Sequence, residues 1–138
     1  MKILREMVRS TTMGMDAIDH VMPYVKDETL AETMRGQKEC LGEALAEAKR
    51  GLTGTEIAES EGSKLSKTVL KASSAISAMI NNDASHIARM LIEGYETGIV
   101  SLQKCINEMQ KSHEEVPICA KDLLKSYDKH VCALRKYL

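Results

Sequence analysis

Histidines and nearby acids are the residues of this sequence whose types and spacing could bind a metal ion. Asp16 precedes His20 by four residues, which places both side chains on one face of a helix. Such a pair could hold one divalent ion with help from another helix. His86 and His130 belong to predicted helices that bring them toward the same end of the molecule. The candidate metal ligands are therefore Asp16, His20, His86 and His130, and the simpler interpretation is four solvated surface residues.

A di-metal centre of the ferritin type would need a richer set of ligands. In such bundles two helices each carry a histidine three residues after a glutamate, and the Glu-x-x-His pattern does not occur in this sequence. The mid-helix positions on the predicted inner faces hold neutral residues: Thr11, Gln37, Gly94, Gly98 and Tyr127. Neutral side chains cannot balance two divalent ions in a dry core. We predict no di-metal centre and no cofactor, with a single divalent ion as the one alternative.

Cysteines could provide nucleophiles, disulfides or zinc ligands. The four are Cys40, Cys105, Cys119 and Cys132, and none forms a C-x-x-C pair, so a zinc knuckle or a thioredoxin-like motif is not expected. Cys105 and Cys119 face each other across a predicted hairpin turn and are the only pair placed for a disulfide. No local signature positions a base beside a serine or cysteine nucleophile. The sequence predicts free thiols and no catalytic residues, and it favours a protein that is not an enzyme.

The overall charge argues against two classes of partner. The net charge is −1, so no global field favours nucleic acid or an acidic membrane. A line of lysines, Lys121, Lys125, Lys129 and Lys136, is interrupted by acids and is interpreted as a solvated helix face. The first residues contain no apolar stretch of signal-peptide length, and no run approaches the roughly 20 apolar residues of a membrane span. We expect a cytoplasmic protein that binds no nucleic acid and does not cross a membrane.

The elements that must position these residues are helices. Apolar residues recur in alternating steps of three and four, the spacing of an amphipathic helix. We predict helices over residues 2–22, 28–50, 64–81, 84–112 and 117–138, within a single domain spanning 1–138. Asp27 and Asp83 are the expected N-caps of two of these helices. With four tyrosines, nine methionines and neither Phe nor Trp in the sequence, we expect methionine to fill gaps in the core rather than to bind copper.

Two helices carry the apolar faces on which the functional argument depends. In the helix over 84–112, the predicted inner face consists of Ile87, Leu91, Gly94, Gly98, Leu102, Cys105 and Met109. In the helix over 117–138, together with the residue before it, the predicted inner face consists of Val116, Ala120, Leu123, Tyr127, Val131, Leu134 and Leu138. The spacing of Gly94 and Gly98 indicates a close approach of another helix, room for a tyrosine ring, or a gap for a small apolar ligand.

A second stripe on the helix over 84–112 consists of Ile92, Ile99 and Ile106, spaced seven residues apart. Three isoleucines in a row would be an unusual surface patch, so something should cover them. The first possibility is the helix over 64–81, through Val69, Ile76 and Ile80. The second possibility is the other subunit of a homodimer. We favour the helix, because it is covalently tethered.

The layout is two long helical hairpins joined by a middle segment with a shorter helix. Three phrases resemble a group of small, uncharacterised bacterial proteins with ferritin-like helical bundles, some of whose relatives are associated with spore coats: MGMDAI (13–18), SHIARMLIEGYETGI (85–99) and CAKDLLKSYDKHVCALRKYL (119–138). The resemblance implies an all-α, ferritin-like four-helix bundle with a shorter helical crossover, and it implies no activity. A simple up-down array of five helices is the competing topology.

We interpret the chain as a non-catalytic structural or interaction module whose protein partner the sequence does not identify. The alternative is a divalent-metal-binding protein with a degenerate site or a site at the end of the bundle. The two hypotheses differ in whether Asp16, His20, His86 and His130 converge.

Overall fold

All regular structure in the described residues is helical. The computed structural model describes residues 1–61 and 83–138. The long helices are α1 (Lys2–Val21), α2 (Glu28–Lys49), α5 (Ala84–Lys111) and α6 (Ile118–Arg135). The 3-10 helix η1 (Met22–Tyr24) follows α1, and the short helix α3 (Gly54–Ser60) follows α2. The all-α class is confirmed for these ranges, whereas the helix predicted over 64–81 lies outside them. No helix in the described part of the chain is long and apolar enough to cross a membrane.

The N-termini of the helices follow from side chains that satisfy free backbone N–H groups. Asp27 caps α2, because its carboxylate accepts hydrogen bonds from the backbone N–H groups of Thr29 at 2.9 Å and Leu30 at 3.1 Å. Asp83 caps α5 in the same way, accepting from the N–H of Ser85 at 3.0 Å. Both predicted caps are therefore confirmed, and they set the start of α2 and of α5.

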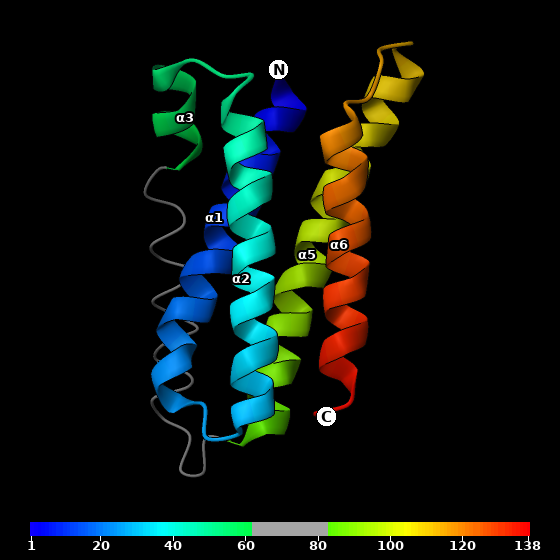
Figure 1. Cartoon of the computed structure of the whole chain (residues 1–138). Coiled ribbons are helices and arrows are strands. Elements are labelled where there is room, and N and C mark those ends of the chain that lie inside the picture. Colours follow the sequence, from blue (N-terminus) through cyan, green and yellow to red (C-terminus); the bar gives the residue numbers. More distant parts are fainter. Residues whose placement is uncertain (62–82) are drawn as a thin grey trace.

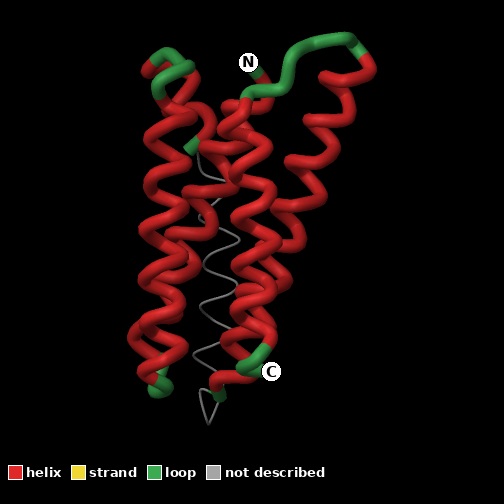
Figure 2. Tube along the Cα trace, turned by 45° about the vertical axis from the view of Figure 1, so that its right-hand side comes forward, coloured by secondary structure: helices red, strands yellow, loops and turns green. Residues whose placement is uncertain are grey.

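Four long helices lie side by side with alternating direction around the core. α1 and α6 descend in the view of Figure 1, whereas α2 and α5 ascend (Figure 1). α1 packs against both α2 and α5, and α6 packs against both α5 and α2. Figure 2 shows the long helices from a second direction, with the loop between α5 and α6 at the end of the bundle opposite the C-terminus. Each long helix therefore has antiparallel neighbours on two sides, and α3 packs against α1.

The apolar face of α5 is wider than predicted: the predicted inner face is buried except at its two glycines, and a second stripe beside it also packs inward. The buried or half-buried positions that recur in steps of four and three are Ala88, Ile92, Tyr95, Ile99, Leu102, Ile106 and Met109. Gly94, which we placed on the inner face, is exposed. Both stripes therefore contribute to the core, and the second adds a tyrosine and three isoleucines beside the predicted face, where the two glycines offer little apolar area.

The isoleucine stripe is consequently part of the core of the chain. Ile92 and Ile106 are buried, and Ile99 is half-buried against the core cluster. α5 needs a wide apolar arc because it packs against two helices, α1 and α6. We expected a separate cover or a homodimer because the stripe would otherwise be exposed, and its burial within the chain removes that reason. The suggested cover residues Val69, Ile76 and Ile80 lie outside the described residues.

The inner face of α6 is confirmed except at its end. Ala120, Leu123, Tyr127, Val131 and Leu134 are buried. α6 ends at Arg135, so Leu138 lies beyond the helix, and its side chain is 62% exposed.

Candidate functional site

Two tyrosines lie at the centre of an otherwise aliphatic core. Tyr95 of α5 and Tyr127 of α6 are buried, with ring centroids 5.6 Å apart. The Tyr95 hydroxyl donates a hydrogen bond to Oε1 of Gln37 at 2.9 Å. Gln37 in turn donates from Nε2 to the backbone carbonyl of His130 at 3.3 Å. The hydroxyl of Tyr127 is hydrogen-bonded to that of Ser10 on α1. Two separate sets of hydrogen bonds thus connect the long helices: one links α5 to α2 and α6, and the other links α6 to α1.

Burial fixes the protonation state of both phenols. Loss of contact with water raises the pKa of Tyr95 and of Tyr127 well above the ordinary value of 10, because a buried phenolate would be poorly solvated. Both hydroxyls therefore remain protonated and neutral under physiological conditions. They can donate and accept hydrogen bonds, but they cannot act as bases.

His130 is a core residue, and our interpretation of it as a surface residue is wrong. Its side chain is only 8% exposed, and its ring lies edge-on to Tyr95 with centroids 5.0 Å apart. Burial lowers the pKa of His130 to about 4, so the ring is neutral at pH 7. Its Nδ1 is buried without a hydrogen-bond partner among the described residues. The sequence did indicate that His130 could be buried. It follows Tyr127 by three residues and precedes Leu134 by four, so it lies on the same face of the helix as these two inner residues.

The other predicted metal ligands do not join His130. Asp16 is half-buried on α1, and His20 is exposed with its Nδ1 2.8 Å from the backbone carbonyl oxygen of Asp16. His86 is exposed in the first turn of α5. Within residues 1–61 and 83–138, no three His, Cys, Asp or Glu side chains are close enough to hold a metal ion together. The surface interpretation thus fits His20 and His86, and the structure brings no metal centre together from these residues.

All four cysteines carry free thiols in the structure. Cys105 is buried, Cys40 and Cys119 are half-buried, and Cys132 is exposed. Burial raises the pKa of Cys105 and of Cys119 above the usual value, which disfavours the reactive thiolate. These two thiols are therefore suited to packing rather than to nucleophilic chemistry.

A groove between α1 and α5 lies beside the two buried tyrosines and could accept a ligand. Its cavity volume is about 360 Å³, within the range of small-molecule sites. Tyr127 reaches it from α6, beneath Gly98 of α5: a Cβ atom placed on Gly98 would be 3.1 Å from Cε2 of the tyrosine. A Cβ placed on Gly94 would meet no atom within 4 Å. The two glycines therefore have different roles: Gly98 accommodates the tyrosine ring, and Gly94 leaves the groove open.

The two ends of the groove differ in polarity. Because α1 and α5 run in opposite directions (Figure 1), residues near the start of α1 lie beside residues late in α5. Near the start of α1 the groove is lined by Glu6, Arg9 and Ser10, next to Ser101 late in α5. Further along α1 and earlier in α5 the lining is mainly apolar and flexible, with the exposed Glu93 as its charged residue; the apolar positions are Met13, Gly14, Ala17, Met90 and Leu91. Methionine side chains adapt to ligands of different shape.

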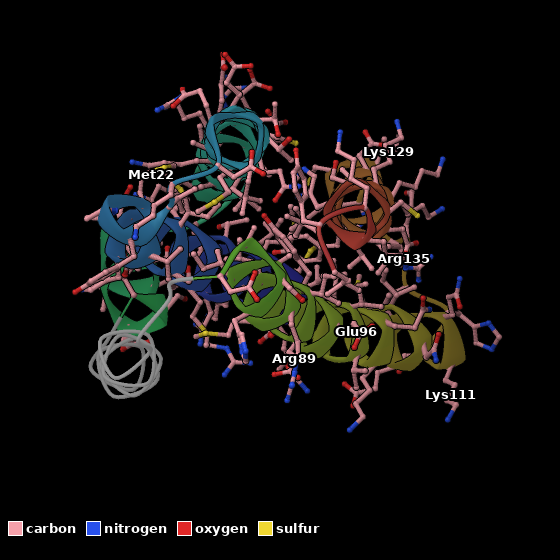
Figure 3. All side chains as sticks on the ribbon, turned by 90° about the horizontal axis from the view of Figure 1, so that it is seen from below. Met22, Arg89, Glu96, Lys111, Lys129 and Arg135 are labelled. Carbon is pink, nitrogen blue, oxygen red and sulfur yellow. The ribbon has the colours of Figure 1, made fainter. Side chains whose placement is uncertain are left out.

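The charged residues of the groove are already paired. Arg9 binds Glu6 with Nη2 2.7 Å from Oε1 and Nε 3.1 Å from Oε2. Glu93, at the other wall, is paired with Arg89 at 3.2 Å. Arg89, Glu96 and Lys111 lie on the side of α5 that faces away from α6 (Figure 3). Each charged group of the lining, Glu6, Arg9 and Glu93, therefore has a partner of opposite sign.

Sequence reasoning identified Gly94, Gly98 and Tyr127 as a place for a ring or a small apolar ligand, but it missed the contribution of α1. Glu6, Ser10, Met13 and Ala17 belong to the groove only because α1 packs beside α5. No match is found among models of known protein families, curated proteins or solved structures.

Proposed function

We propose that this chain is a non-catalytic module that acts by binding, and that the groove between α1 and α5 holds an apolar group of its ligand. The groove itself supports this proposal: about 360 Å³ of space lined mainly by methionine, glycine and aromatic carbon, with most of its polar groups near the start of α1 and two more, Glu93 and Thr97, on α5. Sites for small molecules have this combination of apolar walls and sparse polar groups.

The chemistry of the lining supports binding rather than catalysis. Ser10 is the hydroxyl of the groove that lies against another polar side chain, and that neighbour is the Tyr127 phenol. The pKa of Tyr127 is raised by burial, so the phenol cannot accept the serine proton as a general base would. The acids Glu6 and Glu93 are held in ion pairs.

We further propose that the helices form a ferritin-like four-helix bundle, in which binding occurs between two adjacent helices. The contacts of α1 with α5 and of α2 with α6 support this topology over a simple up-down array, because through them the four long helices enclose one core among themselves. α2 also runs in the same direction as α5 (Figure 1). One long crossover connection gives this arrangement. A cytoplasmic location remains part of the proposal.

A neutral, environment-sensitive dye tests the binding proposal. Nile red should bind the native protein at one site per chain with increased fluorescence, because it needs an apolar surface and no charge. Gly94→Leu should reduce the affinity at least tenfold by filling the groove. Gly36→Leu is the matched control, because Gly36 is also exposed inside a long helix and a Cβ there also meets no atom within 4 Å.

The proposal fails if Gly94→Leu and native protein bind Nile red equally well. It also fails if both leucine variants lose binding to the same extent. In the first case the dye binds outside the groove, and in the second the loss comes from a general effect of leucine in an exposed helix.

A further inference from the structure

The distribution of charge in the α1–α5 groove narrows the class of ligand that it can take. Resting on the proposed function, we infer that the ligand is an uncharged amphiphile with one alkyl chain, whose hydrogen-bonding head lies near Ser10 and Tyr127 and whose chain runs toward Ala17.

The ion pairs of the lining argue for an uncharged head. Glu6 and Arg9 neutralise each other through two hydrogen bonds, and Arg89 neutralises Glu93. An anionic head at the polar end would meet Arg9 together with the repelling carboxylate of Glu6, and a cationic head would meet Glu6 together with the repelling guanidinium of Arg9. Either ion would also lose hydration on entering the apolar groove without a free partner. A neutral head avoids both penalties.

The hydroxyl pair provides the contact for such a head. Ser10 and Tyr127 each have one O–H proton and two acceptor lone pairs. Their mutual hydrogen bond uses one of the two protons. The other proton, together with the remaining lone pairs, can bond an alcohol, ester or amide group of the ligand. Because burial keeps the Tyr127 phenol protonated, this contact stays neutral.

The opposite end of the groove provides the contact for the chain. From Ser10 to Ala17 the α1 helix rises about 10 Å, the length of a medium alkyl chain. Along this distance the lining comprises Met13, Gly14 and Ala17 of α1, with Met90 and Leu91 of α5. Gly94 lies in the opposite wall, and a side chain there would occupy the space in which the alkyl chain runs. The groove is therefore most polar near Ser10 and mostly apolar along the rest of its length, where the exposed Glu93 and Thr97 of α5 are its polar residues.

Three probes with the same chain and different heads test this inference by calorimetry at pH 7. Octan-1-ol should bind native protein at least tenfold more tightly than octanoate or octylammonium. Gly94→Leu should weaken the binding of octanol at least tenfold, whereas Gly36→Leu should leave it unchanged.

Two further variants test the role of the ion pair directly. Glu6→Gln leaves Arg9 without its partner, so it should raise the affinity for octanoate at least fivefold with little effect on octanol. Arg9→Gln leaves Glu6 unpaired and should raise the affinity for octylammonium in the same way. Each variant has the other as its control, because both break one ion pair and differ only in the charge that remains.

The outcomes separate this inference from the proposed function. If all three probes bind equally to native protein, or if octanoate binds best, the neutral head is wrong while the groove still binds alkyl chains. If no octyl probe binds, or if Gly94→Leu binds all three as native protein does, both the ligand class and the binding groove are wrong.

Discussion

His130 has an unusual position for a histidine, because it is buried beside an aromatic ring with an unpartnered Nδ1. Burial lowers its pKa from 6.5 to about 4. Below pH 6.5 the unfolded chain takes up a proton on this residue that the folded chain refuses until about pH 4. The unfolded state then binds more protons, so the free energy of unfolding should fall as the pH decreases from about 6.5 to about 4, by roughly 3 kcal/mol at most.

Urea denaturation at a series of pH values measures this effect. His130→Leu should remove this part of the pH dependence, because leucine cannot be protonated and fills a similar apolar space. His20→Gln should retain it, since His20 is exposed. Equal pH profiles for native protein and His130→Leu would show that the ring is not buried as described.

The glycines of α5 give a second residue-scale prediction. Alanine is favoured over glycine inside a helix by about 1 kcal/mol. Gly94→Ala should therefore stabilise the protein by about 0.5–1 kcal/mol, because its Cβ meets no atom within 4 Å. Gly98→Ala should lose this gain and destabilise the protein, since the new Cβ would be 3.1 Å from a ring carbon of buried Tyr127. Urea midpoints that rise equally for both variants would contradict the tight contact between Gly98 and Tyr127.

At the scale of single elements, the end of α5 is held in a strained conformation. His113 has a φ of 57°, the left-handed region that glycine adopts without cost. Its N–H donates to the carbonyl of Gln110 at 3.1 Å, and the N–H of Glu114 donates to that of Met109 at 2.9 Å. This is the hydrogen-bond pattern of a Schellman motif, in which glycine is the usual residue.

His113→Gly should therefore stabilise the protein by about 0.5–1 kcal/mol, because relief of the left-handed strain exceeds the added freedom of the unfolded chain. Thermal unfolding monitored by circular dichroism measures the change. His113→Ala is the control: it removes the same imidazole but keeps a Cβ, so it should give no such gain. A gain of the same size from alanine would mean that the imidazole itself is unfavourable at this position.

The sequence predicts the extent of the elements well, because helix ends depend on local signals. Asp27 and Asp83 are the N-caps that the sequence indicates, and the prediction over 2–22 differs from α1 by one residue. The full width of the apolar face of α5 was not predictable in this way. Two apolar stripes with the same spacing share that helix, and both contribute to the core because α1 and α6 both pack against it.

At the scale of the whole molecule, the candidate site depends on contacts between distant segments. Ser10 and Tyr127 are hydrogen-bonded across 117 residues of sequence, and Tyr95 and Gln37 across 58. The inner-face spacing placed Gln37 and Tyr127 in the interior, but it gave no indication of their partners. The pairing of Glu6 with Arg9, in contrast, is a local contact three residues apart. The sequence thus predicts which residues are buried better than it predicts the site that they form.

The burial of both apolar stripes of α5 also predicts the stability and the oligomeric state of variants of this helix. Ile106 is 4% exposed and belongs to the core of the chain itself, whereas Val100 on the same helix is 55% exposed. Ile106→Asp should lower the free energy of unfolding by more than about 3 kcal/mol, since it introduces an unpaired charge into the core. Val100→Asp should change both the melting temperature and the sedimenting mass very little. If the isoleucine stripe were instead the contact surface of a homodimer, Ile106→Asp would remain folded and its mass would fall to that of one chain. Thermal melting combined with sedimentation of the two variants therefore distinguishes an internal stripe from a surface that needs a second copy.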